Sequence, residues 1–186
     1  MKKANAFTLI EICIGVVLGA LILSGVFRLL TSSLRVSAKG SATLSNAQAT
    51  AILMAQIVND LHGVWEVSQM LPDQEANSIK LDFVEESEIG GVSSFSIIYD
   101  VLPSRLGVSR TRRITSSVAT NPEIHTFCKG FQILDCKFRR IDVSGGGIGF
   151  FIKLKTGTPP NGTEEFEIKR FVFCRNLASN STLLGW

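Results

Sequence analysis

One carboxylate, Glu11, lies inside an apolar segment that is long enough to cross a membrane. The segment covers residues 7–30, and seven residues without charge follow Glu11 directly, so its side chain lies within the apolar layer. An ionised group at such a depth costs about 2.5–3.5 kcal/mol on insertion scales and marks a functional residue by default. The next cation along the segment is Arg28, far from Glu11. We therefore expect the positive partner of Glu11 to come from another molecule.

Cysteines are the other residues with reactive side chains. Cys13 lies in the apolar segment, whereas Cys128, Cys136 and Cys174 follow it and would face an oxidising compartment if that part of the chain is exported. Cys128 with Cys136, or Cys136 with Cys174, would form a disulfide, and buried free thiols are the alternative because pairing cannot be read from sequence. No Cys-x-x-Cys occurs, so we expect no zinc site.

No other constellation predicts catalysis or ligand binding. The chain has no nucleophile elbow, phosphate-binding loop or catalytic dyad, so we expect neither an enzyme nor a cofactor. Two clusters of glutamate residues lack the Asp/Asn-Gly spacing of a calcium loop and are better interpreted as solvated turns. An arginine group could bind nucleic acid, but a net charge of +3 without interleaved aromatic residues favours an exposed strand face. The acidic groups are Glu85, Glu86, Glu88 and Glu164, Glu165, Glu167, and the arginines are Arg105, Arg110, Arg112 and Arg113.

The apolar segment itself predicts a transmembrane helix. At 1.5 Å per residue its length reaches about 36 Å, more than the ~30 Å of a hydrocarbon core. Lys2 and Lys3 precede it, which predicts a cytoplasmic N-terminus and an exported remainder. Gly15 and Gly19 form a GxxxG pair, which either permits the close approach of a second helix or only reflects the frequency of glycine in membrane helices. A secretory signal cleaved near residues 36–38 is the alternative, but it leaves the carboxylate in the apolar run unexplained.

Beyond the membrane the helix continues, and strands follow it. An apolar stripe at alternating spacings of three and four predicts a helix that ends at Gly63. The members of the stripe are Leu44, Ala47, Ala51, Met54, Val58, Leu61 and Trp65. After Pro72, apolar residues alternate with period two, which predicts half-buried antiparallel strands at 79–83, 95–101, 148–154 and 166–174. The expected fold class is therefore α+β, with a long N-terminal helix, transmembrane in its first half, packed on an antiparallel β-sheet.

The N-terminus resembles the class III signal of type IV pilins and type II secretion pseudopilins, because a basic leader precedes Phe-Thr-Leu-Ile-Glu and an apolar run. The resemblance implies that a prepilin peptidase cuts between Ala6, where the family normally has Gly, and Phe7, and then methylates the new amine. It also implies that the carboxylate of Glu11 faces the N-terminal amine of a neighbouring subunit. Stranding one charge of such a buried pair costs about 3–5 kcal/mol, so Glu11 is expected to govern assembly.

Weaker matches further along the chain narrow this resemblance to J-type minor pseudopilins and W-type minor pilins. Residues 57–61 (IVNDL) resemble their Asp-Leu segment, residues 95–99 followed by 109–112 resemble their paired strands, and residues 173–177 (FCRNL) resemble their terminal strand. The implied function is a minor pseudopilin in the tip and priming complex of a type II secretion pseudopilus. A minor type IV pilin in pilus assembly or adhesion is the alternative. A membrane-anchored periplasmic enzyme or binding protein is the alternative from a different class.

The expected organisation follows from this interpretation. Residues 1–6 form the leader, 7–30 the transmembrane half of the helix, 31–63 its soluble half, and 64–186 a periplasmic β-rich domain. The protein would cross the bacterial inner membrane once, with its N-terminus in the cytoplasm. The expected partners are other minor and major pseudopilins, the prepilin peptidase and the inner-membrane assembly platform, with no metal and no nucleic acid.

Overall fold

The computed structural model describes residues 9–68, 70–86, 92–114, 121–143, 147–158 and 164–178. Within these residues one helix, α1 (Leu9–Gly63), precedes nine strands that form two antiparallel sheets. The chain divides into two compact units, Met1–Ala42 and Thr43–Trp186, and α1 contributes to both. The expected combination of a long N-terminal apolar helix with antiparallel β-structure is confirmed. The expectation of one sheet is wrong, because the strands form two.

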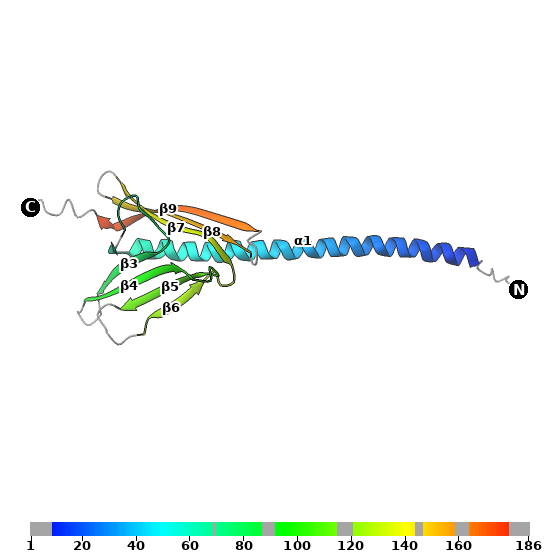
Figure 1. Cartoon of the computed structure of the whole chain (residues 1–186), viewed down its shortest axis with the longest axis horizontal. Coiled ribbons are helices and arrows are strands. Elements are labelled where there is room, and N and C mark those ends of the chain that lie inside the picture. Colours follow the sequence, from blue (N-terminus) through cyan, green and yellow to red (C-terminus); the bar gives the residue numbers. More distant parts are fainter. Residues whose placement is uncertain are drawn as a thin grey trace, which may run out of the picture. The chain divides into compact units, whose positions relative to one another are not determined.

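In the first unit, residues 9–27 of α1 are apolar apart from Glu11 and Ser24 (blue in Figure 1). Every described side chain from Leu9 to Ala42 is exposed. The most apolar window of the helix has a mean hydropathy of 2.5, and none of it is buried. A helix that is apolar all round belongs either in a protein core or in a membrane. Among the described residues nothing buries this segment, and it has the length and composition of a membrane span.

The strands of the second unit form sheet A and sheet B (Figure 1). Sheet A has the order β1–β3–β4–β5–β6, and sheet B has the order β2–β7–β8–β9. The strands of sheet A are β1 (Glu66–Ser68), β3 (Ile79–Glu86), β4 (Val92–Val101), β5 (Val108–Ile114) and β6 (Glu123–Phe127). Those of sheet B are β2 (Glu75–Ala76), β7 (Gln132–Val143), β8 (Gly147–Gly157) and β9 (Glu165–Ala178). The second half of α1 lies between the two sheets in the view of Figure 1 and contacts both.

The core forms where this half of α1 meets the sheets. Leu53, Ile57 and Leu61 are fully buried and contact inward-facing residues of both sheets in one apolar cluster. Burying each such side chain contributes about 1.5–3 kcal/mol to folding. The helix ends at Gly63, as predicted. The residues of α1 that are buried are Asn46, Thr50, Leu53, Met54, Ile57, Asp60 and Leu61.

The predicted helical stripe was only partly right. Met54 and Leu61 are buried, but Leu44 and Trp65, at its two ends, are 60% and 63% exposed. The face of α1 that is buried differs from the predicted one, because three of its residues, Asn46, Thr50 and Asp60, are polar. An apolar pattern gives such residues no weight, although the sheets offer them hydrogen-bond partners.

The four predicted strand segments are strands β3, β4, β8 and β9. Their inward positions are buried as the alternation indicates, for example at Leu81, Tyr99 and Phe150. β7 escaped prediction because its register shifts between Ile133 and Asp135, which changes the parity of the buried positions. β6 escaped because its side chains are mostly exposed and carry no alternation.

Candidate assembly site

Glu11 lies near the start of the described part of α1. Gly15 and Gly19 follow it at intervals of four, so the three residues lie along one ridge of the helix. A Cβ atom at either glycine would meet no neighbouring atom within 4 Å, so this ridge is open to a second helix. Ala6 and Phe7, the predicted processing site, lie outside the described residues. The pairing of Glu11 with a freed amine stays a prediction.

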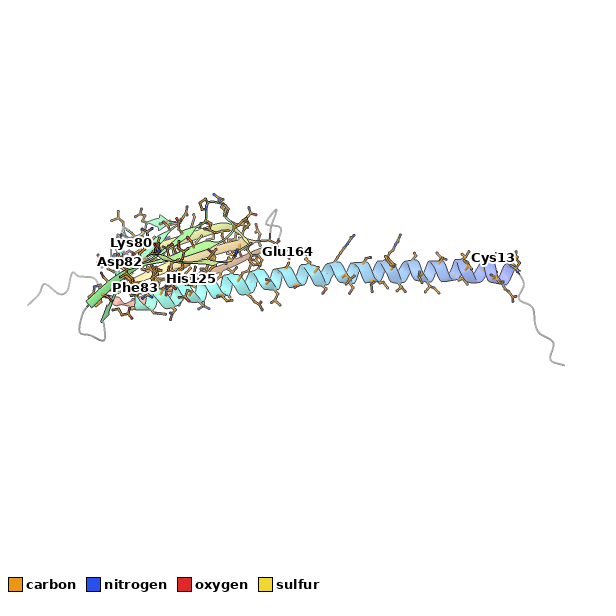
Figure 2. All side chains as sticks on the ribbon, turned by 90° about the horizontal axis from the view of Figure 1, so that it is seen from below. Cys13, Lys80, Asp82, Phe83, His125 and Glu164 are labelled. Carbon is orange, nitrogen blue, oxygen red and sulfur yellow. The ribbon has the colours of Figure 1, made fainter. Side chains whose placement is uncertain are left out.

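The three cysteines of the second unit are buried free thiols. Neither Cys128–Cys136 nor Cys136–Cys174 forms a disulfide, so the structure has the alternative that the sequence left open. Burial raises the pKa of Cys128 to about 11 and those of Cys136 and Cys174 to about 12. A thiol that stays protonated is a poor nucleophile and a poor metal ligand. Cys13 is exposed on the first half of α1 (Figure 2).

A buried polar cluster joins α1 to sheet A. The carboxylate of Asp60, which is only 6% exposed, accepts a hydrogen bond from the hydroxyl of Tyr99 at 2.6 Å. The guanidinium of Arg110 donates to the same carboxylate through Nε at 2.8 Å and through Nη2 at 3.3 Å. Gln56, one helical turn before Asp60, donates to it at 3.0 Å. These residues come from α1, β4 and β5, so the cluster ties the helix to the centre of the sheet.

The electrostatics of this cluster favour a fixed pattern of charges. Burial, with the hydrogen bond and charge of Asp60 as further causes, raises the pKa of Tyr99 well above its usual range. The Tyr99 hydroxyl therefore stays protonated and donates. Burial on its own would lower the pKa of Arg110, but the hydrogen bond and charge of Asp60 outweigh it and raise that pKa. Tyr99 and Arg110 therefore both keep their protons near neutral pH, which suits a structural link between the helix and the sheet.

The cluster unites three segments that the sequence had singled out separately. Asp60 lies in the segment 57–61, Tyr99 in 95–99 and Arg110 in 109–112. Sequence reasoning named these segments through their resemblance to a family but did not predict that these three side chains meet. The available signal was limited to Asp60, which is acidic beside the apolar stripe of the helix, and to Tyr99, whose hydroxyl lies within an apolar alternation.

A second set of polar contacts joins α1 to sheet B. The hydroxyls of Thr50 and Thr156 lie 2.8 Å apart, and both residues are fully buried. The hydroxyl of Thr43 donates to the carboxylate of Glu164, and Asn46 Nδ2 donates to the Glu164 carbonyl oxygen at 3.3 Å. Glu164, labelled in Figure 2, was predicted to be part of a solvated turn, and this prediction was wrong because the residue contacts the helix.

The remaining predicted groups do not form a ligand site. Arg110 is partly buried in the polar cluster and is not part of the exposed strand face that was expected. Arg112 lies over the ring of Phe95 at 4.3 Å and keeps 38% of its side chain exposed. Arg113 is exposed, and His125 pairs with Glu123 at 2.8 Å on the surface. Across the described residues, no group of three or more His, Cys, Asp or Glu side chains could hold a metal ion.

No family model, no curated protein and no solved structure matches this chain. Its function has to be inferred from its own residues and fold. In the part of the chain that the structure describes, the first half of α1 is an exposed apolar segment that carries Glu11. Two sets of polar contacts join the second half of α1 to the β-rich domain that follows it, here called the head. The apolar helix is compatible with a single membrane span.

Proposed function

We propose that this protein is a minor pseudopilin, a structural subunit of the tip and priming complex of a type II secretion pseudopilus that supports protein export. The observation that supports the proposal is that the two halves of α1 have different surroundings. Its first half is apolar, exposed and of membrane length, with Glu11 in its first described turn. Its second half supplies buried residues to the core of a β-rich domain.

A filament subunit of this kind has to be stable in two surroundings. In the membrane the first half of α1 contacts lipid, and in the filament it contacts the helices of other subunits, so it has to be apolar on every side. Glu11 would provide the specific contact in the second surrounding, by pairing with the amine of a neighbouring Phe7. Because Glu11 is retained, the subunit would lie beneath another one and would not be outermost.

The head of such a subunit has to stay attached to its helix while the helix is drawn out of the membrane. The link from Asp60 to Tyr99 and Arg110 on sheet A, and that from Thr50 to Thr156 on sheet B, provide this attachment on two sides. The proposed protein is single-pass in the inner membrane, with a periplasmic head. Its proposed partners are other minor and major pseudopilins, the prepilin peptidase and the inner-membrane assembly platform.

The test is the intact mass of the mature chain isolated from membranes of cells that contain a prepilin peptidase. We expect a chain that begins at Phe7 with an N-methyl group. The variant Ala6→Gly, which introduces the residue typical of the family, should be trimmed at least as fast. A mature chain that begins near Lys39 would indicate a secretory signal instead, and a chain that retains Met1 would also contradict the proposal.

The role of Glu11 is tested by Glu11→Ala, with Ser24→Ala in the same apolar segment as the matched control. Glu11→Ala should leave trimming intact but weaken cross-linking to partner pseudopilins, because the neighbouring amine then lacks its counter-charge, a loss of about 3–5 kcal/mol. Ser24→Ala should behave like the natural chain. If Glu11→Ala cross-links as efficiently as the control, the pairing role is rejected.

A minor type IV pilin in pilus assembly or adhesion is the second candidate, because the class III signal and the segments around Asp60, Tyr99 and Arg110 resemble both groups. Deletion of the protein separates the two. Loss of protein secretion with pili intact supports the pseudopilin, whereas loss of surface pili with secretion intact supports the pilin.

A further inference from the structure

A groove lies between the second half of α1 and strand β9. It consists of two adjoining hollows with volumes of about 340 and 320 Å³, which share Val58, His62 and Arg170. On the helix side its wall includes the small residues Ala51 and Ala55, which leave room for a further segment of chain. On the strand side the wall consists of Ile168, Arg170, Phe171, Val172 and Phe173.

The strand that borders this groove has a free edge. β9 is the last strand of sheet B, and among the described strands only β8 pairs with it. It is 14 residues long and contains no proline, so one row of its backbone N–H and C=O groups is open for pairing. Its single irregularity lies at its C-terminal end, opposite Gly147 and Ile148. Such an edge is a template for an additional strand.

The charges of the groove have one sign. His62 and Arg170 are the only ionisable residues among its described lining, and neither is acidic. Within the described residues, Arg170 has no ion-pair partner, although the other cations nearby do. Lys169 contacts Glu167 at 2.8 Å, and Lys155 contacts Glu165 at 2.6 Å. Arg170 is therefore a cation that has no carboxylate partner among the described residues.

The apolar residues that line the groove point to an occupant that is partly apolar. Val58 of α1 and Ile168 of β9 are half-buried in its wall. The more exposed rings of Phe171 and Phe173 lie over Gly149 and Gly147, on the face of sheet B opposite the buried Val172.

We infer that the groove binds an extended segment of another subunit, which pairs with β9 as an additional strand of sheet B and places a carboxylate against Arg170. The source of the segment, an adjacent filament subunit, rests on the proposed function, whereas the mode of binding rests on the groove alone. With this strand sheet B would have five strands, as sheet A has. Backbone hydrogen bonds to β9 would provide affinity, and the contact with Arg170 would select an acidic segment.

The experiment uses the purified full-length chain in detergent and three short fluorescent peptides, with anisotropy as the readout. The first peptide alternates valine and serine around a central glutamate. The second has lysine in place of the glutamate, and the third is the glutamate peptide with its backbone nitrogens methylated along both edges. We expect the glutamate peptide to bind about tenfold more tightly than the lysine peptide and the methylated peptide not to bind.

The variant Arg170→Glu should reverse the preference between the glutamate and lysine peptides. Lys169→Ala, which removes a neighbouring cation outside the groove, is the matched control and should keep the natural preference. Equal binding of the methylated peptide would overturn strand addition, and an unchanged preference in Arg170→Glu would overturn the role of that residue. Self-association of the chain that excludes the peptides would overturn the assignment to a different subunit. These results are independent of the mass of the mature chain, so this inference and the proposed function can fail separately.

Discussion

The hydroxyl of Tyr99 donates to the carboxylate of Asp60 at 2.6 Å, across 39 residues of sequence. One residue lies on α1 and the other on β4, so this hydrogen bond crosses from the helix to the middle of sheet A. Tyr99 is fully buried and Asp60 is 6% exposed, so water does not compete for the bond. The attachment of the head to the helix therefore depends on a buried charge whose partners are all supplied by the protein.

Tyr99→Phe tests the hydroxyl in this contact. The variant keeps the aromatic ring in the core and removes one donor to a charged group, so we expect a loss of about 1.5–3 kcal/mol in the free energy of unfolding. Urea unfolding of the full chain in detergent, followed by tryptophan fluorescence, measures it. Ser109→Ala removes a hydroxyl on the adjacent strand that donates to the uncharged carbonyl oxygen of Asp100 at 3.1 Å, so it should cost less, about 0.5–1.5 kcal/mol. Equal effects of the two substitutions would contradict a special role for Tyr99.

Asp60 and Arg110 should behave as a coupled pair. Arg110→Met leaves a buried carboxylate without its counter-charge and should cost about 3–5 kcal/mol, whereas Asp60→Leu leaves a partly buried guanidinium without its own and should cost less. The double variant strands neither charge and should lose less than the sum of the two single losses. The same urea titration provides the cycle. Strictly additive losses would show that the two residues do not act together.

Much of the fold was readable from sequence because local patterns determine it. The long apolar run with its single acid predicted the first half of α1, and Gly63 marked the end of that helix. Four alternations predicted β3, β4, β8 and β9. Each of these signals lies within a short stretch of chain, where the period of the apolar residues reports the element directly.

The division into two sheets and the polar cluster could not be read in this way, because they depend on contacts between distant residues. Thr50 and Thr156 are 106 residues apart, and Asp60 and Arg110 are 50 apart. A polar residue is predicted to be exposed unless its hydrogen-bond partner is known. The prediction therefore missed the polar residues on the buried face of α1. The shift in register at Ile133 hid β7 for a related reason, because it breaks the alternation that identifies a strand.

The buried thiols predict how stability depends on pH. The ordinary pKa of a cysteine is 9.0, and burial raises that of Cys136 to about 12. Above pH 9 the unfolded chain therefore loses a proton from this thiol that the folded chain keeps. The contribution of the thiol to stability is fully present below pH 9 and is lost as the pH rises towards 12. The loss amounts to about 1.4 kcal/mol per pH unit for each such thiol, and Cys174 should act in the same direction.

Cys136→Ala and Val172→Ala separate this titration from simple loss of packing. Both positions are buried in the core, at 5% and 3% exposure, so both variants should be less stable than the natural chain at pH 8. Between pH 9 and pH 10.5, urea midpoints of the natural chain and of Val172→Ala should fall together. Cys136→Ala should fall less steeply, by about 1.4 kcal/mol per pH unit, because one thiol no longer titrates in its unfolded state. Parallel slopes for all three proteins would show that Cys136 keeps no proton through burial.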